Sequence, residues 1–330
     1  MNFLAVLAAV AAQANTVPPP IIDMHFHALG AADQGPPPTT ICAPYESWAI
    51  LDPSQPIEAY LKDFLVDPKC SHRITSPKTD AELLKRNIEA LNRSNVIAVA
   101  SGTAAKVEEI RAKVPDRIIP ALHMGETEWP SLTQLRTLHQ AGKLAVLGEI
   151  VSQYAGIAPN DPKLEPYFAL AEELDIPVGI HVGPGPPGVT RLGSPKYRAA
   201  LGNPLALEDV LVRHPKLRVY VMHAGWPMGD EMIALMLTHP SVYVELGVID
   251  FAWPRAEFYS YLKRLMGAGF GKRVMFGSDQ MIWPEAIDAA IVSIQEAPFL
   301  TQQQKRDILY YNAARFLRLT PEHVAKQQAR

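Results

Sequence analysis

The sequence predicts an α/β fold, a single (β/α)8 TIM barrel with long loops after its first and fifth strands. Short apolar runs rich in β-branched residues recur along the chain, and amphipathic stretches separate them. Eight such runs fall within about 260 residues, which is the usual length of a closed barrel. A doubly wound open sheet is the alternative, and it is disfavoured because no Gly-rich phosphate-binding turn follows the first run.

The expected elements alternate regularly along the chain. The predicted strands are 21–27, 95–101, 117–123, 143–151, 176–182, 217–223, 241–246 and 272–279. The clearest predicted helices are 79–92, 163–174, 205–214 and 256–266. Two long segments rich in Pro and Gly, 28–77 and 183–204, follow the first and fifth strands, so we expect both over the C-terminal face that carries barrel chemistry.

The bulk composition is that of an ordinary globular protein. The 330 residues are 48% hydrophobic and 20% charged, with a net charge of -3 and no basic run. This balance argues against a nucleic-acid or anionic-membrane partner, so we expect a small-molecule substrate. A homo-oligomer is compatible with the sequence.

The N-terminus resembles an export signal. Residues 3–12 form an unbroken apolar run, too short to span a bilayer, and Ala12-Gln13-Ala14 fits a small-x-small cleavage site. We therefore expect residues 1–14 to be a signal peptide, residues 15–330 to be the barrel domain, and the mature protein to be periplasmic or secreted. The start lacks Lys or Arg, so the alternative is a packed N-terminal helix on a cytoplasmic protein.

The chain has two cysteines, and both lie in the long segment after the first strand. A disulfide between Cys42 and Cys70 would brace this segment and would suit an exported protein. Two unpaired thiols are the equal alternative, because the sequence does not place the two Cα atoms within bonding range.

Ligand-type side chains interrupt the apolar strands near their C-terminal ends. They are His25, His27, Glu149, His181, His223 and Asp279. His25 and His27 are two residues apart on one strand and therefore share a face. Burying such groups is costly unless they are paired or bind a metal. The nitrogen and oxygen set suits zinc, manganese or iron, and it is too large for one tetrahedral zinc ion, which predicts two ions.

These motifs resemble the amidohydrolase superfamily, closest to its amidohydrolase-related branch. Asp23-Met24-His25-Phe26-His27, Gly148-Glu149, His181, His223-Ala224-Gly225 and Gly277-Ser278-Asp279 follow in the order of the superfamily. The resemblance implies that His25 and His27 hold one ion and that His181 and His223 hold the second. It also implies that Glu149 bridges the ions, where other members use a carboxylated lysine, and that Asp279 binds the first ion and shuttles protons.

The expected function is hydrolysis of a small ester, lactone or amide through a metal-bound hydroxide. A metal lowers the pKa of its bound water from 15.7 toward roughly 7, and Asp279 could accept the proton and pass it on. The alternative is metal-dependent non-oxidative decarboxylation of an aromatic or unsaturated acid, because relatives in the same branch are decarboxylases. A phosphodiesterase and a non-enzymatic metal-binding barrel rank lower. Asp23 is expected either to orient a ligand or to pair in the core.

Four residues near the predicted mouth are candidates for substrate contact. They are His123, Arg191, Trp226 and Trp283. His123 ends the third strand, and Arg191 could hold a substrate carboxylate. Four of the five tryptophans precede a proline, which predicts that each Trp-Pro pair starts a helix with the proline at its first position. The alternative roles are core packing, a solvated charge and a hydrophobic staple.

Overall fold

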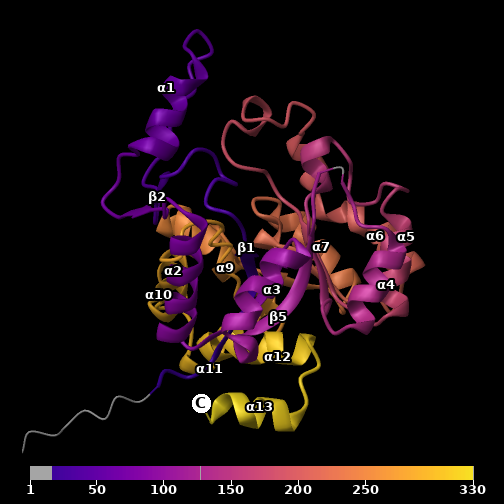
Figure 1. Ribbon diagram of the computed structural model, residues 1–330. Coiled ribbons are helices and arrows are strands. Elements are labelled where there is room, and N and C mark those ends of the chain that lie inside the picture. The colour runs from indigo at the N-terminus through magenta and orange to yellow at the C-terminus, as the bar shows by residue number, and fades with distance from the viewer. Residues whose placement is uncertain (1–16, 127, 330) are drawn as a thin grey trace, which may run out of the picture.

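Eight parallel strands form a nearly closed barrel in the computed structural model, which describes residues 17–126 and 128–329. Each barrel strand except the last pairs with the barrel strand that follows it in the chain, and the strands run through the middle of the molecule (Figure 1). The strands are β1 (Ile21–Ala28), β4 (Val96–Gly102), β5 (Ile118–Met124), β6 (Val146–Ile150), β7 (Val178–His181), β8 (Val219–Met222), β9 (Tyr243–Glu245) and β10 (Val274–Met275). The predicted fold class is confirmed.

The last strand is shorter than the sequence predicted. β10 ends at Met275, and the N–H of Phe276 donates to the carbonyl oxygen of Ile308. The carbonyl oxygen of Phe276 accepts from the N–H of Met24 at 3.0 Å, which ties the last segment to β1. The chain beyond β10 therefore leaves the regular ladder while still closing the barrel.

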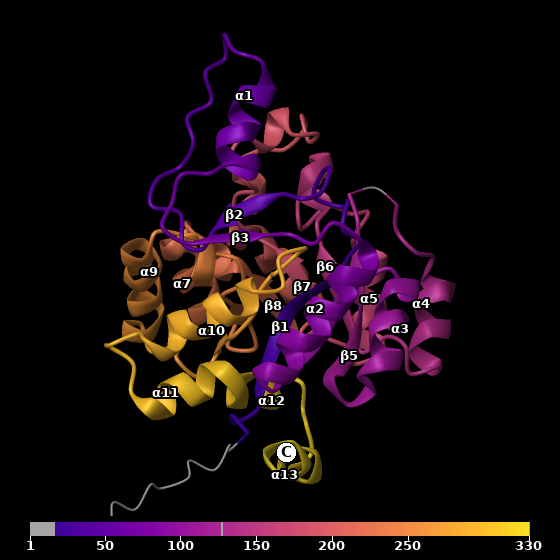
Figure 2. The same cartoon turned by 60° about the vertical axis from the view of Figure 1, so that its left-hand side comes forward.

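Helices surround the barrel as an outer layer (Figures 1 and 2). They are α2 (Asp80–Arg93), α3 (Ala104–Lys113), α4 (Leu132–Gln140), α5 (Glu165–Glu173), α6 (Glu208–Arg213), α7 (Gly229–Thr238), α8 (Ile249–Ala252), α9 (Arg255–Gly267) and α10 (Ala286–Gln295). The four predicted helices correspond to α2, α5, α6 with its preceding turn, and α9. Helix α2 begins where expected because the Thr79 hydroxyl accepts from the N–H of Glu82.

The remaining helices close the N-terminal end of the barrel. α11 (Gln302–Arg306), a π-helical turn (Asp307–Tyr311), α12 (Asn312–Phe316) and α13 (Pro321–Gln328) lie at the end opposite helix α1 (Ile57–Leu61) (Figure 1). Tyr310 and Phe316 contribute to a buried cluster with side chains inside the barrel, including Met24 and Tyr220. A second, larger cluster fills the space between strands and helices. The barrel is therefore a packed core whose chemistry is confined to its open end.

The long segment after β1 is more ordered than the sequence predicted. It contains β2 (Thr40–Cys42) paired antiparallel with β3 (Arg73–Thr75), and α1 (Ile57–Leu61) continues into a π-helical turn (Lys62–Val66). These elements are too short to leave a periodic signal in the sequence. Figures 1 and 2 show the segment as an arm that projects above the barrel.

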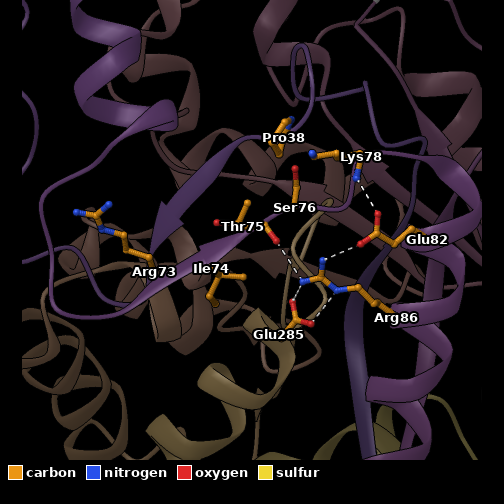
Figure 3. Close-up of a pocket in the computed structure, with 9 residues that line it drawn as sticks. All are labelled: Pro38, Arg73, Ile74, Thr75, Ser76, Lys78, Glu82, Arg86 and Glu285. Carbon is orange, nitrogen blue, oxygen red and sulfur yellow. Dashed lines mark hydrogen bonds and ion pairs between the residues drawn. The ribbon is translucent and has the colours of Figure 1, made fainter.

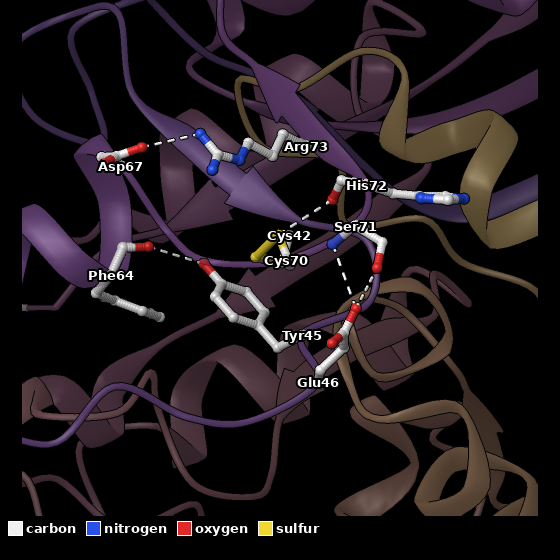
Figure 4. Close-up of a disulfide and its surroundings, with 9 residues drawn as sticks. All are labelled: Cys42, Tyr45, Glu46, Phe64, Asp67, Cys70, Ser71, His72 and Arg73. Carbon is white, nitrogen blue, oxygen red and sulfur yellow. Dashed lines mark hydrogen bonds and ion pairs between the residues drawn. A yellow bond between two sulfur atoms is a disulfide. The ribbon is translucent and has the colours of Figure 1, made fainter.

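A disulfide joins Cys42 to Cys70 at the base of this arm, with the Cα atoms 6.0 Å apart (Figure 4). The disulfide alternative is therefore the correct one. The Tyr45 hydroxyl donates to the Phe64 carbonyl oxygen inside the closed loop. These contacts make the arm a self-packed unit.

The arm touches the second long segment. The Tyr60 hydroxyl donates to the carbonyl oxygen of Pro187 at 2.8 Å, and its ring packs against Gly188, where φ is +81°. This second segment holds short 3-10 turns, among them Val189–Arg191 and Ala199–Gly202, so it too is less irregular than predicted. The two predicted loops thus meet through Tyr60.

The prediction that the proline of each Trp-Pro pair occupies the first position of a helix was wrong. Pro254 lies immediately before helix α9, and Pro130, Pro227 and Pro284 each lie two residues before the first helical residue.

The N-terminal residues expected as a signal peptide lie outside the described residues. Within the described ranges, no helix is long and apolar enough to cross a membrane.

Candidate metal centre

The six predicted ligands converge at the C-terminal ends of the strands. All six are at least 94% buried: His25, His27, Glu149, His181, His223 and Asp279. β1 supplies the first two, and β6, β7, the turn after β8 and the segment after β10 supply one each. Parallel barrel strands present their C-terminal ends on one face, which brings side chains more than 250 residues apart into one cluster.

The first group of donor atoms surrounds the two β1 histidines. The Nε2 atoms of His25 and His27 are 3.1 Å apart. Asp279 Oδ1 lies 3.0 Å from His27 Nε2 and 3.6 Å from His25 Nε2. Glu149 Oε2 lies 3.4 Å from both of these nitrogens. Two nitrogens and two oxygens therefore point at one common position.

The second group involves the other oxygen of the same glutamate. Glu149 Oε1 lies 2.9 Å from His181 Nδ1 and 3.5 Å from His223 Nε2. The two histidine nitrogens are themselves 2.9 Å apart. Glu149 thus presents one carboxylate oxygen to each pair of histidines.

The donor spacings fit divalent metal ions. Two ligands bound tetrahedrally at zinc distances of about 2.0–2.1 Å lie about 3.3 Å apart, and the observed spacings scatter around this value. The cluster therefore has the composition and the geometry of a metal cradle.

The electrostatics of the cluster keep both carboxylates ionised. Burial alone raises the pKa of Glu149, but the charge of His25 and the hydrogen bonds from His181 and His223 outweigh it and hold the pKa well below its ordinary value. Burial raises the pKa of Asp279 as well, and His25 and His27 outweigh it in the same way. The carboxylates of Glu149 and Asp279 therefore stay negatively charged in a buried site of low dielectric constant, where a bound cation would balance their charge.

The pKa values of the three histidines His25, His223 and His181 shift in different directions. Burial lowers the pKa of His25, yet the charges of Asp279, Glu245 and Glu149 outweigh burial and raise it well above its ordinary value. The pKa of His223 is also raised, because the hydrogen bond to Glu149 and the charge of Asp279 outweigh burial. Burial and the neighbouring His223 lower the pKa of His181. In the metal-free cluster, protons therefore gather on His25 and His223.

Backbone conformations at the strand ends help to aim the ligands. His223, Ala224 and Asp279 have φ values of +56°, +51° and +47°, in the left-handed region that non-glycine residues rarely adopt. Gly148 must lack a side chain, because a Cβ there would collide with the Gly179 carbonyl oxygen of the neighbouring strand. The site is thus built on local strain and close strand packing that the surrounding fold maintains.

Glu245 is a site residue that the sequence reasoning missed. It ends β9 with 0% exposure, and its Oε1 accepts from His25 Nδ1 at 3.1 Å and from the His223 N–H at 2.7 Å. Its Oε2 accepts from the Gly247 N–H at 2.6 Å. A signal was present, because Glu245 interrupts the apolar run 242–246 in the same way as Glu149 interrupts 145–150.

The contacts of Glu245 decide which nitrogen of His25 faces the cluster. A carboxylate on Nδ1 fixes the proton there and leaves the Nε2 lone pair for a metal. The Gly247 carbonyl oxygen does the same for His223, since it accepts from Nδ1 at 2.9 Å. Both histidines are thereby oriented with Nε2 toward Glu149.

Asp23 has a clear position beneath the cluster. Its Oδ1 accepts from the N–H groups of His25 and Ser278, and its Oδ2 accepts from the Ser278 hydroxyl. Burial raises the pKa of Asp23 to about 6. Asp23 therefore links β1 to the segment that carries Asp279, which combines the two expected roles.

His123 lies beside the cluster, as its place at the end of a strand suggested. Its ring centroid is 6.2 Å from that of His27, and one of its nitrogens lies within 4.8 Å of ligand atoms of His27 and Glu149. Burial lowers the pKa of His123 to about 4, so its imidazole is neutral. Its Nδ1 is buried and has no hydrogen-bond partner in the described part of the chain.

The other three substrate candidates lie in different surroundings. Arg191 is exposed in the second long segment. The Trp226 indole N–H donates to Glu257, and its ring packs edge-on against Trp253. Trp283 is 2% exposed, and its indole N–H donates to the carbonyl oxygen of Thr39. Its indole therefore packs inside the protein and binds the long segment after β1.

A hollow of about 720 Å³ lies away from the metal cradle, between β3 and α2 (Figure 3). Its central cation, Arg86, is already paired with Glu285 and Glu82 and donates to the Thr75 carbonyl oxygen. None of the six predicted ligands lines it. This hollow is therefore separate from the chemistry of the barrel mouth.

Comparison with known proteins shows the family of this chain and its similarity in fold to solved structures. A model of the amidohydrolase family matches residues 22–319. Protein fluG of Emericella nidulans is 22% identical over 161 residues, which make up 44% of this chain and 18% of that protein. The chain therefore spans less than a fifth of the length of this curated relative.

Two solved structures illustrate the similarity in fold. A probable 2-pyrone-4,6-dicarboxylic acid hydrolase from Acinetobacter baumannii is 14% identical with a TM-score of 0.58, and the match covers 91% of this chain and 99% of that one. The 5-carboxyvanillate decarboxylase from Novosphingobium aromaticivorans, complexed with manganese, is 16% identical with a TM-score of 0.53, and coverage is 73% and 83%. The family match and the histidine–carboxylate cradle together identify a metal-dependent enzyme, and the chain belongs to the amidohydrolase family.

Proposed function

We propose that this protein is a hydrolase that cleaves a small ester, lactone or amide at a centre of two divalent ions. Zinc is the expected metal, and manganese or iron would suit the same donors. The observation that carries the proposal is the orientation of Glu149, whose two oxygens face two different histidine pairs. A carboxylate in that position can bridge two ions, and a two-ion centre is typical of metal-assisted hydrolysis.

Each side chain of the cradle has a defined part in this proposal. His25, His27 and Asp279 would hold the first ion, and His181 and His223 would hold the second. Bound divalent ions supply Lewis acidity that lowers the pKa of water and polarises a carbonyl oxygen. Asp279 then accepts the proton of the attacking water on its carboxylate and returns it to the leaving group. Its lowered pKa favours the ionised form that accepts this proton.

Metal counting tests the two-ion centre. Purified protein reconstituted with zinc and freed of excess metal should retain two ions per chain by mass spectrometry of its metal content. Glu149→Ala should retain at most one, because the bridge between the two histidine pairs is lost. A single tightly held ion whose amount is the same in the wild type and in Glu149→Ala would overturn the binuclear assignment.

Decarboxylation is the second candidate, because the manganese-containing 5-carboxyvanillate decarboxylase shares the fold. A panel of lactones, esters, amides and aromatic carboxylates, assayed with the metal-reconstituted protein, separates the two reactions. Hydrolysis releases an acid and an alcohol or amine, whereas decarboxylation releases carbon dioxide. Carbon dioxide from an aromatic acid, with no turnover of any lactone, ester or amide, would replace the hydrolase proposal with the decarboxylase.

A further inference from the structure

The arm loop, which is the part of the arm that the disulfide closes (residues 42–70), carries an excess of negative charge. It contains five acidic and two basic residues, which gives a net charge of -3. The acidic residues are Glu46, Asp52, Glu58, Asp63 and Asp67, and the basic residues are Lys62 and Lys69. Lys69 pairs with Asp67, whereas Glu58 and Asp63 are exposed and have no ion-pair partner among the described residues. The arm loop therefore presents unpaired negative charge to solvent.

The second long segment, residues 183–204, carries the opposite charge. It contains Arg191, Lys196 and Arg198 and no acidic residue, so its net charge is +3. All three cations are exposed, and none of them forms an ion pair within the described ranges. The second segment therefore presents unpaired positive charge.

The arm loop and the second segment lie next to each other on the C-terminal side of the barrel (Figures 1 and 2). The Tyr60 hydroxyl joins them through its hydrogen bond to the Pro187 carbonyl oxygen. In the part of the chain that the structure describes, no ion pair connects them, and Asp67 pairs with Lys69 and Arg73 instead. A surface with a negative half beside a positive half is complementary to itself after a twofold rotation, because each half then meets the opposite charge of the other copy.

The arm loop also exposes apolar side chains. Ile50 is 90% exposed, more than any other large hydrophobic residue in the described ranges, and Val66 is 61% exposed. Single exposed hydrophobic residues are common on monomeric proteins, but Trp48 and Leu51 beside Ile50 are only partly buried as well. Covering this stretch with another molecule would remove apolar surface from water and favour association.

We propose that this protein associates with a second copy of itself through these two segments, so that each arm loop lies on the second segment of the other copy. The negative charge around Ile50 favours a second copy over an anionic membrane as the occupant. The two segments follow β1 and β7, the strands that carry His25, His27 and His181, so the interface lies at the rim of the barrel mouth. The inference does not depend on which reaction the cradle catalyses.

Analytical ultracentrifugation of the purified protein measures the association. Because only two surface segments take part, we expect a dissociation constant of about 1–100 µM for the wild-type dimer at low salt. The dimer should weaken between about 0.01 M and about 1 M salt, since the Debye length falls from about 30 Å to about 3 Å.

Two charge-reversed variants test which surfaces meet. Arg191→Glu combined with Lys196→Glu changes the net charge of the second segment to -1, so this segment would face an arm loop of the same sign. Glu58→Lys combined with Asp63→Lys changes the net charge of the arm loop to +1, so this loop would face a positive second segment. Each variant alone should be monomeric, whereas an equimolar mixture should form a heterodimer because opposite charges then meet at both contacts. Association of the mixture would also exclude misfolding as the reason why each variant alone is monomeric.

Ile50→Ser tests the apolar part of the interface. It should weaken the dimer about 10- to 100-fold, because twofold symmetry removes the side chain from both copies. Leu237→Ser is the matched control, since Leu237 is 73% exposed on α7, outside both segments. This control should associate like the wild type.

Three results would overturn the proposal. The first is a wild type that sediments as a monomer at about 500 µM and low salt, well above the expected dissociation constant. The second is a mixture of the two charge-reversed variants that stays monomeric although the wild type dimerises. The third is an Ile50→Ser variant that associates as tightly as the wild type. Failure of the hydrolase assignment is distinguishable from all three, because it would leave the sedimentation results unchanged.

Discussion

Glu245→Gln is the substitution that best tests how the cradle is oriented. The glutamate carboxylate accepts three hydrogen bonds, from His25 Nδ1, the His223 N–H and the Gly247 N–H. A glutamine of the same shape offers only one oxygen, so its amide nitrogen must face either His25 and His223 or Gly247. In the first orientation the amide donates to His25 Nδ1, which moves the histidine proton to Nε2 and blocks its metal-binding lone pair.

The expected magnitude follows from these contacts. One hydrogen bond to a charged acceptor is lost and its buried donor is left unpaired, which costs about 1.5–3 kcal/mol. The remaining bonds become neutral and weaken by about 1 kcal/mol each. The metal-free variant should therefore be less stable by about 3.5–5 kcal/mol. Its zinc affinity should fall about 10- to 100-fold, as for other groups that orient a metal-binding histidine.

Competition with a chromogenic chelator measures the zinc affinity, and urea unfolding of the metal-free protein measures its stability. Glu89→Gln is the matched control, since it makes the same change of charge on the exposed face of α2. This control should match the wild type in both measurements. If Glu245→Gln bound zinc as tightly as the wild type and unfolded at the same urea concentration, then Glu245 would not orient His25.

Three further predictions concern the base, the disulfide and the protons of the metal-free cluster. Asp279→Asn should retain the fold but lower kcat by about 10²- to 10⁴-fold in steady-state assays, and full turnover would exclude Asp279 as the proton shuttle. Reducing Cys42–Cys70, which spans 28 residues, should lower the free energy of unfolding by about 3.5 kcal/mol, and limited proteolysis should then cleave the arm first. An arm that stays resistant after reduction would show that its packing alone maintains it. Because the pKa values of His25 and His223 are raised, their protons stabilise the metal-free fold fully below pH 6.5, and this contribution is lost as the pH rises through the raised values. Zinc binding at pH 7 should therefore release protons, and its calorimetric enthalpy should differ between phosphate and Tris buffers; identical enthalpies would contradict this assignment.

The sequence by itself determined the barrel and singled out the six candidate ligands that converge at its mouth, because both leave local signals. A parallel strand buried on both faces reads as a short apolar run, and a histidine or carboxylate at the end of such a run stands out. His25 and Glu149 were found in this way. The same signal was present at Glu245, which ends the apolar strand β9, but Glu245 was not among the predicted ligands.

Only the tertiary structure decided which atoms face one another. The division of Glu149 between two histidine pairs depends on the stagger of neighbouring strands, and no local pattern encodes that stagger. The same holds for the Cys42–Cys70 bond, which needs the β2–β3 pairing to bring the two thiols together. Identities and spacing are local properties of the chain, whereas hydrogen-bond partners and ligand geometry are set by contacts between residues far apart in sequence.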